Sequence, residues 1–133
     1  PVELRTSGLT NALRDLAYRT SQGGKVTCRF DCPKPVRILD DAIALNLFRI
    51  AQEAVTNALK HAKPKSIVIS LKRRGRALIL TVADDGKGLP AKRPSGGMGI
   101  SIMQHRANVL GAALTVESRR TEGTIVTCTL PRR

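Results

Sequence analysis

The sequence predicts an α+β fold in which helices cover one face of a mixed, largely antiparallel β-sheet. The order of the expected elements is helix, strand, helix, hairpin, loop, helix and hairpin, and this order leads to that fold class. A chain of 133 residues, of which 41% are hydrophobic, suits one compact domain. Such a chain can bury enough surface to form a core without metal or disulfide crosslinks.

In the first half of the chain, helical spacing of apolar residues and a set of stop signals define the expected elements. The first helix is expected to end near Thr20, before a polar segment at 21–24. A strand is expected at 25–30, and the prolines of the following loop prevent its continuation. The longest helix is expected over 42–62, capped by Asp40 or Asp41 and stopped by Pro64.

Alternating apolar residues and short glycine-containing turns define the second half. The expected elements are, in order, strands 66–72 and 77–83, a glycine-rich loop 84–99, a helix 100–110, and strands 114–118 and 124–130. Each of these two strand pairs is expected to form a hairpin, which accounts for most of the antiparallel pairing.

The composition limits the possible functions. The excess of 23 Lys and Arg over 10 Asp and Glu gives a net charge of +13, which favours an anionic partner such as nucleic acid. One Tyr, two Phe and no Trp leave almost nothing on which bases could stack, so single-strand and RNA-binding platforms are disfavoured. The three cysteines form no Cys-x-x-Cys pair and indicate reduced, cytosolic thiols. We expect a soluble domain, since the chain contains neither a signal-peptide pattern nor an apolar run of membrane-spanning length.

The long helix carries a polar stripe that could bind a metal ion and phosphate. Glu53 and Asn57 are four residues apart and Lys60 follows three residues later, so an α-helix would bring all three to one narrow stripe. Mg²⁺ takes oxygen ligands and usually keeps several waters and phosphate oxygens, while a lysine neutralises phosphate charge. An ordinary half-solvated helix face is the alternative interpretation.

The loop 84–99 contains a second group of candidate residues. Glycines at the spacing of Gly86, Gly88, Gly97 and Gly99 allow close backbone approach, and amide groups at the start of the next helix favour anions. The adjacent Asp84 and Asp85 should point in different directions at the end of a strand, so a carboxylate dyad is not expected. The pattern differs from a P-loop because no Gly-Lys-Ser/Thr follows it.

Three motifs together resemble those of bacterial sensor histidine kinases. Residues 52–62 (Gln-Glu-Ala-Val-Thr-Asn-Ala-Leu-Lys-His-Ala) resemble the N box, Asp84 to Gly88 the first glycine box, and Gly97 to Ile100 the second, in the family's order. The start and end of the N box, with Met103 to Ala107, are most similar to the subfamily of nitrate/nitrite and membrane-fluidity sensors. Residues 1–16 resemble the tail of that subfamily's dimerisation helix.

The resemblance implies a fold and a set of roles. The fold would be a two-layer α/β sandwich of five strands and three helices, shared with gyrase, a heat-shock chaperone and mismatch-repair ATPases. Asn57 would bind Mg²⁺, Glu53 would act through a water or the metal shell, and Lys60 would contact phosphate. The residues that the resemblance assigns to ATP are Asp84 at the adenine amine, Gly86 and Gly88 around that pocket, Gly97 and Gly99 as lid hinges, and Ile100 and Thr124.

The resemblance also implies how the chain is organised. Residues 1–22 would be the tail of a dimerisation helix and a linker, and 23–133 the ATP-binding catalytic domain. His61 and His105 do not match the phosphoacceptor motif, so the acceptor histidine would lie before Pro1, on the dimerisation domain of a homodimeric parent. A response regulator would then receive the phosphate. The domain would be cytoplasmic, whether or not its parent is anchored in the inner membrane.

Two alternatives remain open on sequence alone. One is a serine kinase of the anti-sigma-factor type, or a related ATPase on the same fold. The other is a basic nucleic-acid-binding module, although no nucleic-acid partner is expected under the resemblance.

Overall fold

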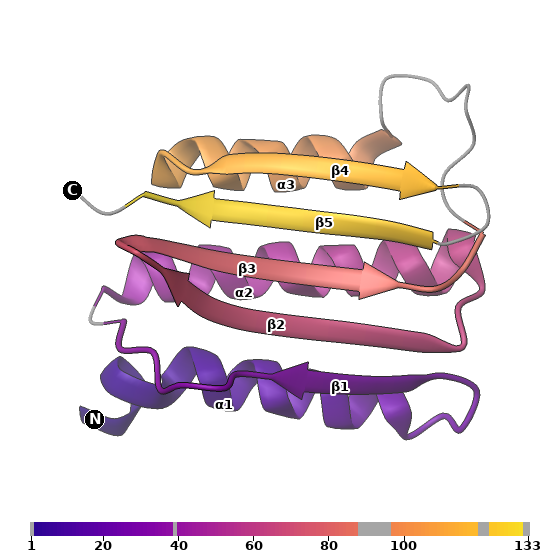
Figure 1. The fold of residues 1–133 in the computed structure, drawn as a ribbon, viewed down its shortest axis with the longest axis horizontal. Coiled ribbons are helices and arrows are strands. Elements are labelled where there is room, and N and C mark those ends of the chain that lie inside the picture. Colours follow the sequence, from indigo (N-terminus) through magenta and orange to yellow (C-terminus); the bar gives the residue numbers. More distant parts are fainter. Residues whose placement is uncertain (1, 39, 88–96, 120–122, 132–133) are drawn as a thin grey trace.

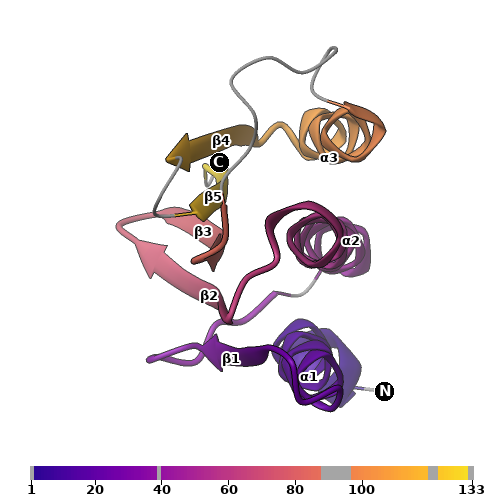
Figure 2. The same ribbon diagram turned by 90° about the vertical axis from the view of Figure 1, so that its right-hand side faces the viewer.

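The computed structural model describes residues 2–38, 40–87, 97–119 and 123–131. The chain forms two layers, with a twisted sheet on one side and the helices on the other (Figures 1 and 2). The described elements are α1 (Val2–Ser21), β1 (Thr27–Asp31), α2 (Asp41–Asn57), the π-helix η1 (Ala58–Ala62), β2 (Ser66–Arg74), β3 (Ala77–Asp84), α3 (Gly97–Leu110), β4 (Ala113–Arg119) and β5 (Gly123–Leu130). The predicted fold class is confirmed.

The sheet has five strands in the order β1-β2-β3-β5-β4, counted over the described residues. β1 pairs with β2 in parallel, and every other neighbouring pair is antiparallel. The predicted hairpins β2–β3 and β4–β5 are both present, and β5 inserts between β3 and β4. This insertion places the start of β5 beside the end of β3, where Ala83 pairs with Ile125.

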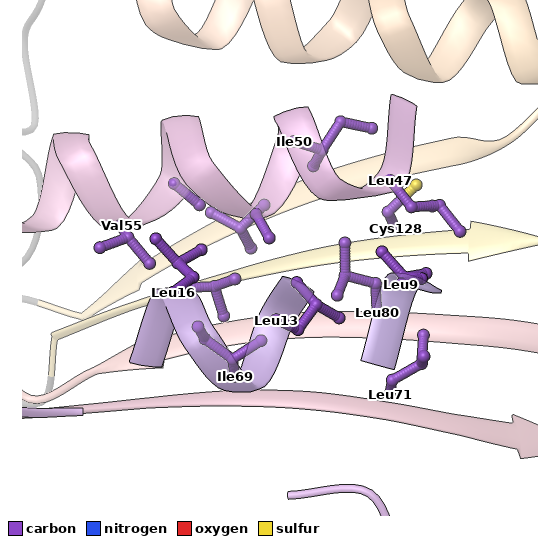
Figure 3. Packing of buried hydrophobic residues seen from close by; sticks show 14 of the residues in the cluster. Leu9, Leu13, Leu16, Leu47, Ile50, Val55, Ile69, Leu71, Leu80 and Cys128 are labelled. Carbon is purple, nitrogen blue, oxygen red and sulfur yellow. The ribbon is translucent and has the colours of Figure 1, made fainter. Parts of the chain in front are cut away.

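The core lies between the sheet and the three described α-helices. Period-2 burial is clear in β2 and β3, whose inward-facing Ile69, Leu71 and Leu80 are at most 1% exposed. Figure 3 shows these side chains packed against Leu13 of α1 and Leu47 of α2. Because α1 supplies Leu9, Leu13, Leu16 and Ala17 to this cluster, its second half packs as part of the sandwich.

The ends of α1 and α2 follow local rules. Asp40 caps α2, since its Oδ1 accepts hydrogen bonds from the backbone N–H groups of Ala42 (2.8 Å) and Ile43 (3.2 Å). Ser21 ends α1 and joins it to β1, because its hydroxyl oxygen accepts from the N–H of Cys28 at 2.8 Å. No helix in the described ranges is both long enough and apolar enough to span a membrane.

One predicted helix differs in type and one predicted boundary was wrong. The helix expected over 42–62 does end at Ala62, but it is α-helical only to Asn57 and continues as a π-helix over 58–62. Its last residue is followed by Lys63 in the left-handed conformation (φ 48°), directly before Pro64, which cannot donate a backbone hydrogen bond. The second long helix begins at Gly97, not near Ile100, so Gly97 and Gly99 lie in its first turn rather than in the loop.

Candidate functional site

The polar residues of α2 meet the start of α3 at one end of the molecule. Gly99, in the first turn of α3, lies directly against Glu53 and Asn57 of α2. A Cβ atom on Gly99 would lie 2.5 Å from Glu53 Oε1 and 2.8 Å from both Nδ2 and Oδ1 of Asn57. Both side chains are only partly buried. An acid and an amide therefore converge on one point beside a helix N-terminus, as their spacing in the sequence predicts.

A second polar group lies at the end of β3. The Asp84 carboxylate is partly buried, and its Oδ1 accepts a hydrogen bond from the Gly86 N–H at 2.8 Å. Loss of water through burial raises the pKa of Asp84, and the charge of Asp85 acts in the same direction. Hydrogen bonds from the backbone N–H groups of Gly86 and Thr124 lower the pKa of Asp84 but do not cancel the effect of burial.

The start of β5 completes this second group. Gly123 has a φ of 93° and its Cα lies against the Asp84 backbone, where a Cβ atom would collide with the Asp84 carbonyl oxygen. The next residue, Thr124, is 7% exposed, and its Oγ1 is the buried side-chain oxygen without a hydrogen-bond partner among the described residues. A buried hydroxyl without a partner is unfavourable, so this position is suited to a ligand or an ordered water.

Gly86 links the two groups. The Gly86 backbone lies against Ala62, the last residue of η1, and a Cβ atom at this position would collide with the Ala62 carbonyl oxygen. The same oxygen accepts a hydrogen bond from the Lys87 N–H at 2.9 Å. The loop that follows Asp84 is therefore attached to the end of the helical segment that carries Asn57.

Asp85 faces away from Asp84 and binds the backbone of β2. Its Oδ1 accepts hydrogen bonds from the N–H groups of Lys65 (2.8 Å) and Ser66 (2.9 Å). These hydrogen bonds lower the pKa of Asp85, chiefly the one from Ser66. The expectation that the two adjacent aspartates point in different directions is confirmed, and they do not form a dyad.

The other predicted site residues lie on η1, on α3 or outside the described ranges. Lys60 is exposed and lies in the π-helix that begins at Ala58, and its expected position beside Asn57 stays a prediction. Ile100 is partly buried in the first turns of α3, and Gly97 is the first residue of that helix. Gly88 lies outside the described residues, together with the rest of the expected lid at 89–96.

Sequence reasoning missed two contributors. The Ala62 carbonyl receives the loop, but a backbone acceptor has no residue-type signature, and nothing in the sequence marked the π-helix. The partners of Asp85 lie about 20 residues away in the chain, and only the pairing of β2 with β3 brings them together. In the part of the chain that the structure describes, no three His, Cys, Asp or Glu side chains cluster as metal ligands.

Comparison with known proteins identifies a family over most of this region. The family of histidine kinase-, DNA gyrase B- and HSP90-like ATPases matches residues 42–133, which include every candidate site residue. This range begins at the second residue of α2 and extends to the last residue of the sequence.

Curated relatives extend the similarity over nearly the whole chain. The signal transduction histidine-protein kinase/phosphatase DegS of Bacillus subtilis is 32% identical over 98% of this chain and 36% of its own length. The corresponding kinase/phosphatase UhpB of Salmonella typhimurium is 35% identical over 100% of this chain and 26% of its own. The nitrate/nitrite sensor protein NarQ of Escherichia coli is 32% identical over 92% of this chain and 22% of its own length. The chain thus spans only about a fifth to a third of these relatives.

Solved structures agree with the fold. The histidine kinase domain of the blue-light activated kinase EL346 from Erythrobacter litoralis superimposes with a TM-score of 0.75 at 28% identity, over 92% of this chain and 60% of that one. The ATP-binding domain of PrrB from Mycobacterium tuberculosis gives the same TM-score at 19% identity, over 94% of each chain, and supports the fold alone. These findings favour the histidine-kinase interpretation over a nucleic-acid module.

The contact of Gly99 with Glu53 and Asn57 generates the first prediction. In a Gly99→Ala variant the added methyl group must displace both side chains, so we expect ATP affinity to fall by about tenfold or more, measured by calorimetric titration. Gly23→Ala is the matched control, because Gly23 has no atom within 4 Å of a Cβ position and its φ is not positive. Unchanged ATP affinity in the Gly99→Ala variant would contradict the contact.

Proposed function

Because this chain belongs to the family of histidine kinase-, DNA gyrase B- and HSP90-like ATPases and is homologous to sensor histidine kinases, we propose that it is the catalytic domain of such a kinase. In this proposal it binds ATP with Mg²⁺ and transfers the γ-phosphate to a histidine outside residues 1–133. A response regulator then receives the phosphate from that histidine. The whole reaction, its acceptor and its partners are inferred, since the chain spans a minor part of its curated relatives.

One observation carries the proposal. Two separate sets of polar groups lie at the same end of the sandwich, where α2 and β3 end and α3 and β5 begin (Figure 1). One set contains Glu53 and Asn57 beside the start of α3, and the other contains Asp84 beside Thr124. A nucleotide has the matching polarity, with an anionic metal-binding end and a base that carries hydrogen-bond donors and acceptors.

The second set suits adenine. A partly buried carboxylate that has lost some of its water gains from a donor such as the exocyclic amine of adenine. The unpaired Thr124 hydroxyl can take a bond from the same base or from a bridging water. At Gly86 and Gly123 the backbone packs closely on the carbonyl groups of Ala62 and Asp84, which keeps the chain around Asp84 compact, and Gly88, outside the described residues, would be the third glycine around the adenine site.

The first set suits the phosphates. The side-chain oxygens of Glu53 and Asn57 converge beside Gly99 and are of the kind that Mg²⁺ prefers, so the donor set fits this ion. Asn57 would hold the metal directly and Glu53 would orient a water or another metal ligand. Bound Mg²⁺ would neutralise phosphate charge. Backbone N–H groups in the first turn of α3, from Gly97 to Ile100, would face the phosphates, and the exposed Lys60 would add a mobile positive charge.

Phosphoryl transfer needs positioning and charge stabilisation more than covalent chemistry from the protein. In this mechanism Asp84 holds the base, the first turn of α3 holds the phosphate chain, and the acceptor histidine supplies the nucleophile. Gly97 and Gly99 would be the hinges of the expected lid, whose other residues lie outside the described ranges, and exclusion of water until the acceptor docks would be the purpose of that lid.

Residues 1–22 would join this domain to the dimerisation helices of the parent. That role is compatible with the packing of Leu9, Leu13 and Leu16 on the sandwich, because the first residues of α1 precede this contact. The parent would be a homodimer whose dimerisation domain carries the acceptor. We place the domain in the cytoplasm, which its free cysteines and its use of ATP favour.

Labelled phosphate tests the function. When the full-length protein is incubated with γ-labelled ATP, we expect acid-labile phosphohistidine on a peptide outside residues 1–133. His61 and His105 are both exposed on this domain, so the measurement must map the modified peptide. Phosphate on either of these two residues, or on serine, would contradict the proposed reaction.

The metal role of Asn57 can be separated from general binding. We expect Mg²⁺ to strengthen ATP binding to the unaltered chain, and Asn57→Ala to remove most of this gain, by about tenfold or more. Calorimetric titrations with and without Mg²⁺ measure it. Asn108→Ala, on the exposed part of α3, is the control and should keep the full gain. If Asn57→Ala weakens binding equally with and without Mg²⁺, Asn57 is not the metal ligand.

The raised pKa of Asp84 predicts a pH dependence. Ionised Asp84 is the stronger acceptor for the adenine amine, so ATP affinity should be full at a pH above the raised pKa of Asp84. The affinity should fall as the pH is lowered through that pKa, which lies above the ordinary aspartate value of 3.8. Protonation of a group whose pKa is raised by folding does not destabilise the folded state, so this loss should precede acid unfolding. Asp84→Asn is the control, because titration of the ATP phosphates affects both proteins equally. Parallel pH profiles for both would contradict the assignment.

A further inference from the structure

We propose that Asp85 is a positioning residue that sets the preference for adenine by fixing the direction of the neighbouring Asp84 carboxylate. The proposal rests on the function proposed above and adds a specificity determinant to the same site. Asp85 itself does not touch the nucleotide in this arrangement. It acts through the backbone that it holds.

The contacts of Asp85 form a two-sided clamp between β3 and β2. Its Oδ1 accepts from the N–H groups of Lys65 at 2.8 Å and Ser66 at 2.9 Å, and its own N–H donates to the Ser66 carbonyl at 3.2 Å. The two strands are therefore joined beyond their last regular pair, Ile67 with Asp84. Strand ends without such contacts fray, and the register of the final residue is then loosely held.

The clamp lies next to Asp84, whose carboxylate would have to be aligned with the adenine amine. Asp84 is the last residue of β3, and its partly buried carboxylate accepts hydrogen bonds from the N–H groups of Gly86 and Thr124. A hydrogen bond weakens steeply as its donor and acceptor lose alignment, so a small shift of the β3 end would weaken contact with an adenine amine. The proposed metal and phosphate contacts, at Asn57 and Glu53, lie on α2, and neither residue is a hydrogen-bond partner of the Asp85 carboxylate.

Asp85 is exposed, so its substitution can test a positioning role without disturbing the packing of the core. Removing an exposed side chain creates no cavity, so the main losses are its two accepted hydrogen bonds. Asp40, at the start of α2, offers a matched control. There the exposed Asp40 also accepts from two backbone N–H groups, those of Ala42 and Ile43.

The readout is the ratio of two dissociation constants. Purine riboside 5′-triphosphate differs from ATP only by lacking the exocyclic amine, so the ratio of its dissociation constant to that of ATP isolates the contact with Asp84. A change that merely unfolds part of the protein lowers both affinities equally and leaves the ratio unchanged. For the unaltered chain we expect a ratio of about ten or more, since hydrogen bonds to charged groups are among the stronger ones.

Four variants, compared with Asp84→Asn, test the proposal by calorimetric titration with both nucleotides. We expect the ratio to fall to about three or less in Asp85→Ala, and also in Asp85→Glu, which keeps the charge but moves the carboxylate away from Lys65 and Ser66. Asp85→Asn should restore most of the ratio, because its amide oxygen can accept from the same two N–H groups. Asp40→Ala should lose a comparable capping contact and keep the ratio of the unaltered chain.

The outcomes distinguish this inference from the proposed function. If Asp84→Asn abolishes the preference for ATP while Asp85→Ala and Asp85→Glu keep it, the adenine site stands and the positioning role of Asp85 is refuted. If Asp40→Ala lowers the ratio as much as Asp85→Ala, the adenine preference responds to the loss of an exposed capping contact far from Asp84, the effect is not specific to Asp85, and the inference also fails. Equal binding of both nucleotides by the unaltered chain would overturn the inference and the adenine assignment together.

Discussion

The candidate site depends on one close approach of the backbone, between Gly86 and Ala62. No side chain longer than hydrogen fits there without striking the Ala62 carbonyl oxygen, and the Lys87 N–H donates to that oxygen at 2.9 Å. Ala62 ends the helical segment that carries Asn57, and Gly86 follows Asp84 by two residues. This contact therefore sets the spacing between the two polar groups, which belong to different layers of the sandwich. A ligand that bridges them needs both layers in place, so its binding is coupled to the packing of α2 on the sheet.

The π-helix makes this approach possible. A helix ends with backbone carbonyl groups that lack partners within the helix, and they need a bond from elsewhere. After Ala62 the chain turns through the left-handed Lys63 to Pro64, so the carbonyl of Ala62 is open to the loop rather than to a further helical turn. Irregular helical turns of this kind are frequent at functional sites, and here the turn carries Lys60, whereas Glu53 and Asn57 lie on α2. Lys60 is exposed, and the acid and the amide are held against Gly99.

Much of the fold could be predicted because its signals are local. Alternating apolar residues identified β2 and β3, glycine turns identified the hairpins, and Asp40 was one of two predicted caps at the start of α2. The site residues came from short motifs, and the structure brings Asp84 to Thr124, and Asn57 to Gly99. The early start of α3 was missed because Gly97 and Gly99 have low helix propensity, and contact with α2 at Gly99 outweighs it. The unpaired hydroxyl of Thr124 was also beyond local reasoning, since its burial depends on β5 pairing with both β3 and β4.

The adjacent Asp84 and Asp85 have the same side chain, but their surroundings shift their pKa values in opposite directions. Asp84 loses water and its pKa rises, while two backbone N–H groups hold Asp85 ionised and lower its pKa. Placing like charges side by side raises the pKa of Asp84 further, yet Asp85 remains exposed, where water screens much of this repulsion. A poorly hydrated carboxylate has less water to lose when a donor approaches, so the burial that raises the pKa of Asp84 also favours its proposed role in recognising an amine. The hydrogen bonds that Asp85 accepts from the N–H groups of Lys65 and Ser66 hold the backbone beside this carboxylate from the solvent side.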